Sequence, residues 1–199
     1  MIRLFAALVA AAAALAGCAS NLPPAPVKAA TPEYRYLIGA GDSLNISVWR
    51  NPELSATVPV RPDGKITAPL VEDIVAIGKN PTDLAREMEE KLKKYIQDPV
   101  VTIVVQGFVG PTSEQVRIVG QATRPAALNY KQDMTVLDAM IAVGGLTEFA
   151  SGNRAVLIRA SEGNKSYNVR LHDLLKRGDV SANVELRPGD VIIIPESWF

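Results

Sequence analysis

The chain has 199 residues, and its 21 Lys and Arg are balanced by 21 Asp and Glu, so the formal net charge is zero at neutral pH. This balance leaves no basic excess for binding nucleic acid, which is therefore not expected as a partner. One histidine and one cysteine form no ligand cluster for a metal ion, and we expect neither a metal nor another cofactor.

Residues 1–17 have the layout of a bacterial secretory signal. Arg3 precedes an apolar run from Leu4 to Leu15, and small residues stand directly before Cys18. The run is shorter than the ~20 apolar residues that a membrane-spanning helix needs. Leu15-Ala16-Gly17-Cys18 resembles the lipobox of bacterial lipoproteins. An ordinary cleaved signal with an incidental cysteine is the alternative.

The lipobox resemblance implies that Cys18 is lipidated and becomes the first residue of the mature chain. Ala19 and Ser20 follow it in place of the aspartate that signals retention at the inner membrane. This implies delivery to the outer membrane, where the lipid would hold the protein on the inner leaflet, facing the periplasm. Residues 18–33 include a proline-rich stretch, which predicts an extended, semi-rigid tether.

Residues 34–106 are expected to form a first domain with a mixed β-sheet and one helix. Polar and apolar side chains alternate from Ser43 to Trp49, which is typical of a half-buried strand. Pro62-Asp63-Gly64 predicts a hairpin turn. The β-branched run from Val100 to Val105 predicts a strand that returns to the sheet.

The helix of this domain is predicted to begin after Asn80, a capping residue followed by Pro81 in the first turn. Asp98-Pro99 ends it. Apolar residues at helical spacing are expected to share its buried face: Leu84, Met88, Leu92, Tyr95 and Ile96. Three carboxylates are expected to be solvated on the polar side: Glu87, Glu89 and Glu90.

Residues 107–114 are expected to be a hinge, and residues 115–199 a second domain. Thr135 caps a short helix that Gly144-Gly145 closes. The predicted order of strand, strand, helix, strand, strand, strand indicates a small α+β domain of the β-grasp type. The fold class expected for the whole chain is therefore α+β with two small domains.

One short pattern occurs twice, because Gly41-Asp42 and Gly189-Asp190 each precede an apolar strand. Glycine turns the chain, and the aspartate is expected to accept hydrogen bonds from the backbone amides that follow it. Neither aspartate needs a catalytic role. His172 is expected at the surface, and Asp173 beside it forms no dyad because adjacent helical residues point in different directions. We assign no catalytic residue and expect no enzyme.

Several segments in order resemble the bacterial outer-membrane polysaccharide export proteins. In the first domain these are Tyr36–Asp42, Val60–Ile66 and Asp98-Pro99-Val100. In the second they include Thr135–Ala139, Gly144–Thr147 and Arg187–Val191. The resemblance covers nearly all of residues 34–199 and implies a polysaccharide export domain followed by a soluble-ligand-binding β-grasp domain. The closing Pro195–Phe199 resembles a narrower group, found in systems that also carry an exosortase.

The resemblance implies a non-enzymatic role in exopolysaccharide or capsule export. Lipid-anchored subunits would form a homo-oligomeric ring through or beside which polysaccharide passes, above an inner-membrane co-polymerase or chain-length protein. The chain ends at Phe199 after one β-grasp domain, without the amphipathic helix that closes the best-known capsule-export members. We therefore expect a periplasmic collar, with a separate outer-membrane protein such as a β-barrel supplying the pore.

A monomeric periplasmic lipoprotein that binds a glycan or a cell-wall component is the alternative. Polar side chains able to hydrogen-bond sugar hydroxyls stand at Arg124, Asn129 and Arg154. Aromatic residues make up only 6% of the chain, and no stacking stripe is visible in the sequence. Trp49 and Trp198 are candidates for interfaces.

Overall fold

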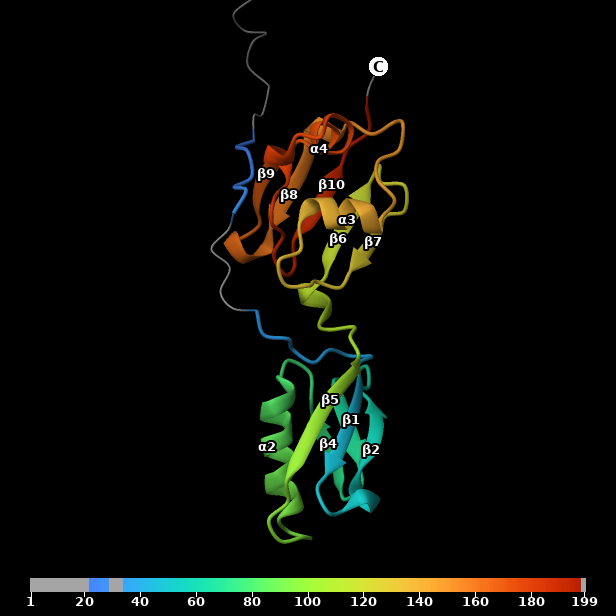
Figure 1. The fold of residues 1–199 in the computed structure, drawn as a ribbon, viewed down its shortest axis with the longest axis vertical. Coiled ribbons are helices and arrows are strands. Elements are labelled where there is room, and N and C mark those ends of the chain that lie inside the picture. Colours follow the sequence, from blue (N-terminus) through green and yellow to red (C-terminus); the bar gives the residue numbers. More distant parts are fainter. Residues whose placement is uncertain (1–21, 29–33, 198–199) are drawn as a thin grey trace, which may run out of the picture.

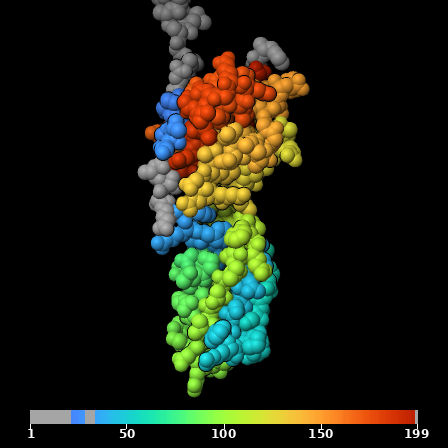
Figure 2. Space-filling view, viewed as in Figure 1, coloured from blue at the N-terminus to red at the C-terminus, as the bar shows by residue number. Residues whose placement is uncertain are grey.

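The computed structural model describes residues 22–28 and 34–197, so Cys18 and Trp198 lie outside the described residues. Two bodies, each with its own hydrophobic core, are stacked end to end (Figure 1). The same elongated outline is visible in the space-filling view (Figure 2). Residues 107–115 connect the two bodies and lie at their junction.

The first body contains a three-stranded antiparallel sheet in the order β2-β1-β5. Its strands are β1 (Ser43–Val48), β2 (Ala56–Pro59) and β5 (Val101–Gly107). A hairpin of β3 (Lys65–Ala68) and β4 (Val71–Val75) completes the strands of this body. Helix α2 (Pro81–Leu92) packs against β5, and alternate strand residues such as Ile46 and Ile103 meet it in a common core.

Helix α2 starts where the sequence predicts, because Oδ1 of Asn80 accepts a hydrogen bond from the Asp83 amide at 2.9 Å. The helix ends earlier than the apolar spacing implied. Tyr95 lies beyond the last turn and is 58% exposed, so its predicted place on the buried face is wrong. Residues 93–98 form turns instead, which carry the chain toward β5.

Glu89 was expected to be solvated, and this prediction is also wrong. Its side chain is buried on α2 against the start of β5, where Oε1 accepts the Val101 amide hydrogen at 2.8 Å. Oε2 pairs with the Arg86 guanidinium at 2.6 Å. The first amide of β5 needs an acceptor that the sheet does not supply, and a helix carboxylate provides it.

The second body contains a five-stranded mixed sheet in the order β7-β6-β10-β8-β9. The strands are β6 (Val116–Gly120), β7 (Ala126–Leu128), β8 (Ala155–Arg159), β9 (Lys165–Val169) and β10 (Val191–Ile194). β10 runs parallel to β6 and antiparallel to β8. The helices are α3 (Val136–Ala142) and α4 (Leu171–Arg177). Side chains of α3 such as Met140 pack on sheet residues including Leu157.

Single turns of 3-10 helix lie at Pro52–Leu54, Thr112–Glu114, Gly152–Arg154, Ala160–Glu162 and Val180–Ala182. The mixed sheets and three helices of the described residues confirm the predicted α+β fold class with two small units. Among the three helices described in residues 34–197, none has both the length and the apolar character that crossing a membrane requires.

Residues 22–28, part of the predicted tether, lie along the second body beside β9 (Figure 1). The Ala25 amide donates to the Asn168 carbonyl at 3.1 Å, and the Asn168 amide donates to the Pro23 carbonyl at 2.9 Å. β9 is an edge strand whose unpaired backbone groups need partners. Ala25 is buried in the core of the second body, so this part of the segment is attached to the folded protein.

Candidate functional site

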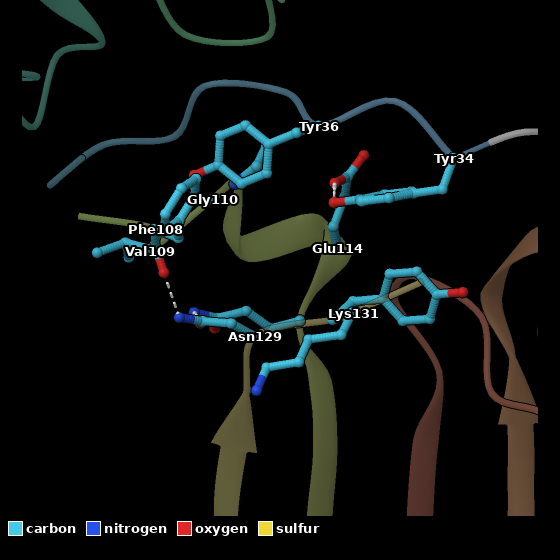
Figure 3. A pocket seen from close by; sticks show the side chains of 11 residues that line it. Tyr34, Tyr36, Phe108, Val109, Gly110, Glu114, Asn129 and Lys131 are labelled. Atoms are coloured by element: carbon cyan, nitrogen blue, oxygen red, sulfur yellow. Dashed lines mark hydrogen bonds between the residues drawn. The ribbon is translucent and has the colours of Figure 1, made fainter. Parts of the chain in front are cut away.

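A cleft of about 320 Å³ lies at the junction of the two bodies (Figure 3). Its walls come from three parts of the chain that are distant in sequence. These are Tyr34 and Tyr36 before β1, residues 108–115 of the linker, and residues 129–131 after β7. The cleft therefore exists only because the chain brings both bodies and the linker together.

Aromatic rings form much of the wall of this cleft. Tyr34 meets Tyr130 edge to face, with ring centroids 5.0 Å apart, and Tyr36 meets Phe108 in the same way at 5.5 Å. Phe108 is 61% exposed. The sequence showed no stacking stripe because these four residues follow no common period. The structure shows an aromatic surface that sequence reasoning missed.

Two of the tyrosines are held by carboxylates. The Tyr34 hydroxyl donates to Glu114 at 3.0 Å, and the Tyr36 hydroxyl donates to Asp42 at 2.6 Å. Burial, together with these hydrogen bonds, raises the pKa of both Tyr34 and Tyr36 far above the ordinary value of 10.0. Both hydroxyls therefore stay protonated and keep donating throughout the physiological pH range.

The remaining polar wall is built from amides and one ammonium group. Nδ2 of Asn129 donates to the Phe108 carbonyl at 2.6 Å, and Nε2 of Gln115 donates to Oδ1 of Asn129 at 3.3 Å. Lys131 also lines the cleft. Its backbone carbonyl accepts the Met134 amide hydrogen at 3.1 Å, and its ammonium charge adds to the hydrogen bonds from Thr135 that lower the pKa of Asp138. The cleft thus combines flat apolar faces with a small number of hydrogen-bonding groups.

Asp42 fixes the linker to the first body. Its fully buried carboxylate accepts hydrogen bonds from the Gly39 amide at 2.9 Å, the Val109 amide at 2.7 Å and the Gly110 amide at 2.9 Å, besides the Tyr36 hydroxyl. Gly39 must be a glycine, because a Cβ there would lie 2.0 Å from the Gly110 carbonyl group. The linker backbone is therefore held against the turn that precedes β1.

The second Gly-Asp turn lies close against the other end of the linker. The Asp190 carbonyl accepts from the Arg117 amide at 2.9 Å, and a Cβ on Gly189 would lie 2.7 Å from the Ser113 carbonyl oxygen. In both turns the carboxylate accepts from the amide three residues earlier, Gly39 or Arg187, at 2.9 Å. The sequence predicts that each aspartate accepts hydrogen bonds from the amides directly after it, and this prediction is wrong. Within its own turn, each carboxylate accepts from an amide that precedes it.

Asp190 should make stability depend on pH. Burial raises the pKa of its carboxyl from 3.8 to about 6, so the folded chain binds this proton more tightly than the unfolded chain. Its contribution to stability is therefore complete below about pH 4 and is lost as the pH rises through about 6. Asp190→Asn keeps an acceptor for the Arg187 amide. This variant should not show the decline in the free energy of unfolding, which amounts to at most about 3 kcal/mol in the parent.

Denaturant unfolding of the parent and the variant, in buffers spanning that range, measures the effect. Glu148→Gln, which alters an exposed carboxyl group of the same body, is the matched control and should keep the parental pH profile. An Asp190→Asn profile parallel to that of the parent would contradict the assignment.

Of the candidate residues that the sequence singled out, the structure brings one to the cleft and places the others elsewhere. Asn129 lines the cleft, but Arg154 bonds Ser151 and the Glu196 carbonyl, and Arg124 lies beside Gly144. Trp49 is 68% exposed and directly follows the last residue of β1. The linker begins at the opposite end of this strand, where Ser43 pairs with Gly107.

His172 is exposed on α4, which confirms the predicted surface position. Asp173 is buried beside it and bonds Asn153, Arg170 and Arg177. No group of three His, Cys, Asp or Glu residues within 22–28 and 34–197 is placed to hold a metal ion.

Comparison with known proteins gives matches over most of the chain. Residues 30–106 match the family described as polysaccharide biosynthesis/export protein, and residues 114–194 match the SLBB domain. The EPS I polysaccharide export outer membrane protein of Ralstonia nicotianae is 26% identical over 81% of this chain and 47% of its own length.

Two further relatives show the same pattern. The capsule polysaccharide export protein of Haemophilus influenzae is 25% identical over 80% of this chain and 43% of its own length. The exopolysaccharide production protein of Rhizobium meliloti is 30% identical over 81% of this chain and 40% of its own length. The chain thus spans less than half the length of these relatives.

Proposed function

Because the chain belongs to the polysaccharide biosynthesis/export protein family, we propose that it is a non-enzymatic component of polysaccharide export at the outer membrane. The observation that supports the proposal is the succession of the two matched domains, each of which contributes most residues of one hydrophobic core. The substrate class is a capsular or extracellular polysaccharide. Lipidation of Cys18 would hold the protein on the periplasmic side of the membrane.

The exporting form is a ring of identical subunits that rests on the outer membrane and receives polysaccharide from an inner-membrane co-polymerase or chain-length protein. A ring of this kind needs a heterologous contact between neighbours. Exposed apolar side chains at Trp49, Val100 and Val104 on the first body are the kind of surface that such a contact covers.

Gene deletion and mass measurement together test this function. Deletion should abolish surface polysaccharide, and the full chain supplied in trans should restore it. The full chain, purified in mild detergent, should have the mass of a closed oligomer. Normal polysaccharide in the deletion strain would refute the export role. A monomer that binds glycan would favour the alternative, a periplasmic glycan-binding lipoprotein.

A further inference from the structure

We propose that the cleft between the two bodies binds a sugar unit of the exported polysaccharide. This inference rests on the proposed function and adds to it a site and the class of its ligand. The observation behind it is the convergence of four aromatic rings and several hydrogen-bonding groups on one cavity at the junction (Figure 3).

The shape and the apolar part of the cleft fit a pyranose ring. A pyranose has a flat face of C–H groups and a rim of hydroxyls, so it is recognised by an aromatic surface bordered by polar groups. The cavity volume of about 320 Å³ lies at the small end of the ~300–1,000 Å³ range for ligand cavities, which suits a mono- or disaccharide. Phe108 is the most exposed ring of the wall at 61%.

The polar groups of the wall keep unused hydrogen-bonding capacity. Glu114 uses Oε2 for the Tyr34 hydroxyl, which leaves its other carboxylate oxygen to accept from a sugar hydroxyl. The Asn129 amide uses one hydrogen for the Phe108 carbonyl, which leaves its second hydrogen to donate. The Lys131 ammonium interacts with Asp138 through its charge, and its hydrogens can donate to a sugar hydroxyl or to a sugar carboxylate.

The walls are fixed before any ligand arrives. Asp42 ties the Tyr36 hydroxyl and the linker amides of Val109 and Gly110 to the first body. Glu114 ties Tyr34 to the linker, and Tyr130 is buried in the core of the second body. A preformed site loses little entropy when it binds. This distinguishes the cleft from the exposed apolar side chains elsewhere on the surface.

Saturation-transfer NMR on the full chain in mild detergent tests the site. The probe is the oligosaccharide mixture obtained by partial hydrolysis of the polysaccharide that the producing cell exports. Irradiation of the protein's aromatic protons should transfer saturation to the C–H protons of the sugars. Phe108→Ala and Lys131→Ala should each weaken binding about three- to tenfold, as expected for loss of one aromatic or polar contact.

Phe149→Ala is the matched control, because Phe149 is a 51% exposed phenylalanine that does not line the cleft. It should leave the affinity unchanged, and circular dichroism should show that all three variants fold. Absence of saturation transfer from the parent chain would overturn the site. So would equal weakening by Phe149→Ala and Phe108→Ala.

The genetic test separates failure of the site from failure of the function. If deletion abolishes export but the hydrolysate does not bind, the cleft assignment is wrong and the export role stands. If deletion leaves export intact, the export role is wrong, whatever the binding experiment shows.

Discussion

Replacing Cys18 with serine should leave a folded chain that separates from the membrane and exports almost no polysaccharide. The proposed lipid contributes about 0.8 kcal/mol for each buried methylene, and stable attachment takes more than one acyl chain. Serine lacks the thiol that would carry the lipid. Loss of the lipid removes this attachment, so release from the bilayer is the expected consequence.

The proposed lipid would also limit how far the second body can lie from the bilayer. Cys18 stands five residues before Pro23, which bonds Asn168 beside β9. Those five residues span at most about 18 Å when fully extended. A lipid on Cys18 would therefore hold the second body close to the bilayer.

Membrane fractionation and quantification of surface polysaccharide measure the effect of Cys18→Ser. Ser20→Ala, which changes a neighbouring residue but keeps the cysteine, is the control and should behave like the parent. Denaturant unfolding of the released chain should match that of the parent. Normal export by Cys18→Ser would show that partner contacts, and not the lipid, hold the protein in place.

Asp42→Ala should destabilise the first body by about 3–5 kcal/mol and loosen the junction. Its buried carboxylate accepts four hydrogen bonds, from the Tyr36 hydroxyl and from the amides of Gly39, Val109 and Gly110. A donor left without its acceptor in a buried site costs about 1–3 kcal/mol, and water can compensate only the more exposed ones. Asp42→Asn should also destabilise, because its NH₂ group would face other donors.

Denaturant unfolding gives the loss of stability, and hydrogen exchange locates it. The amides of Val109 and Gly110 should exchange faster in Asp42→Ala, while those of the second core should change little. Asp63→Ala is the matched control, since Asp63 is an exposed partner of Arg61 and such pairs contribute at most about 1 kcal/mol. Equal stability of the two variants would contradict the role of Asp42.

Several elements were predictable because the information for them is local. Asn80 and Pro81 mark the start of α2, and Thr135 forms a capping box with Asp138 at the start of α3. Alternation of apolar residues places Leu44 and Ile46 on the buried face of β1. The motifs of the family are likewise short and ordered along the chain, so the α+β fold class and the export family could be identified from the sequence.

Local patterns failed where a distant segment decides the environment of a residue. Glu89 lies outside the apolar stripe of α2, which predicts a solvated side chain. It is buried because its carboxylate accepts the hydrogen of the Val101 amide at the start of β5. Tyr95 continues the apolar spacing of α2, but the chain leaves the helix before reaching it. In each case a long-range contact or a turn overrides the helical period.

By itself, the sequence determined the fold class, the helix starts and the family, because capping, alternation and turn chemistry act over a few neighbouring residues. Only the tertiary structure decided that four aromatic residues, Tyr34, Tyr36, Phe108 and Tyr130, share one cleft. It also decided that Asp42 bonds one end of the linker and that Gly189 lies close against the other end. These residues are separated by tens of positions with no common period. Their proximity depends on how the two bodies pack around residues 107–115, and no local signal encodes that packing.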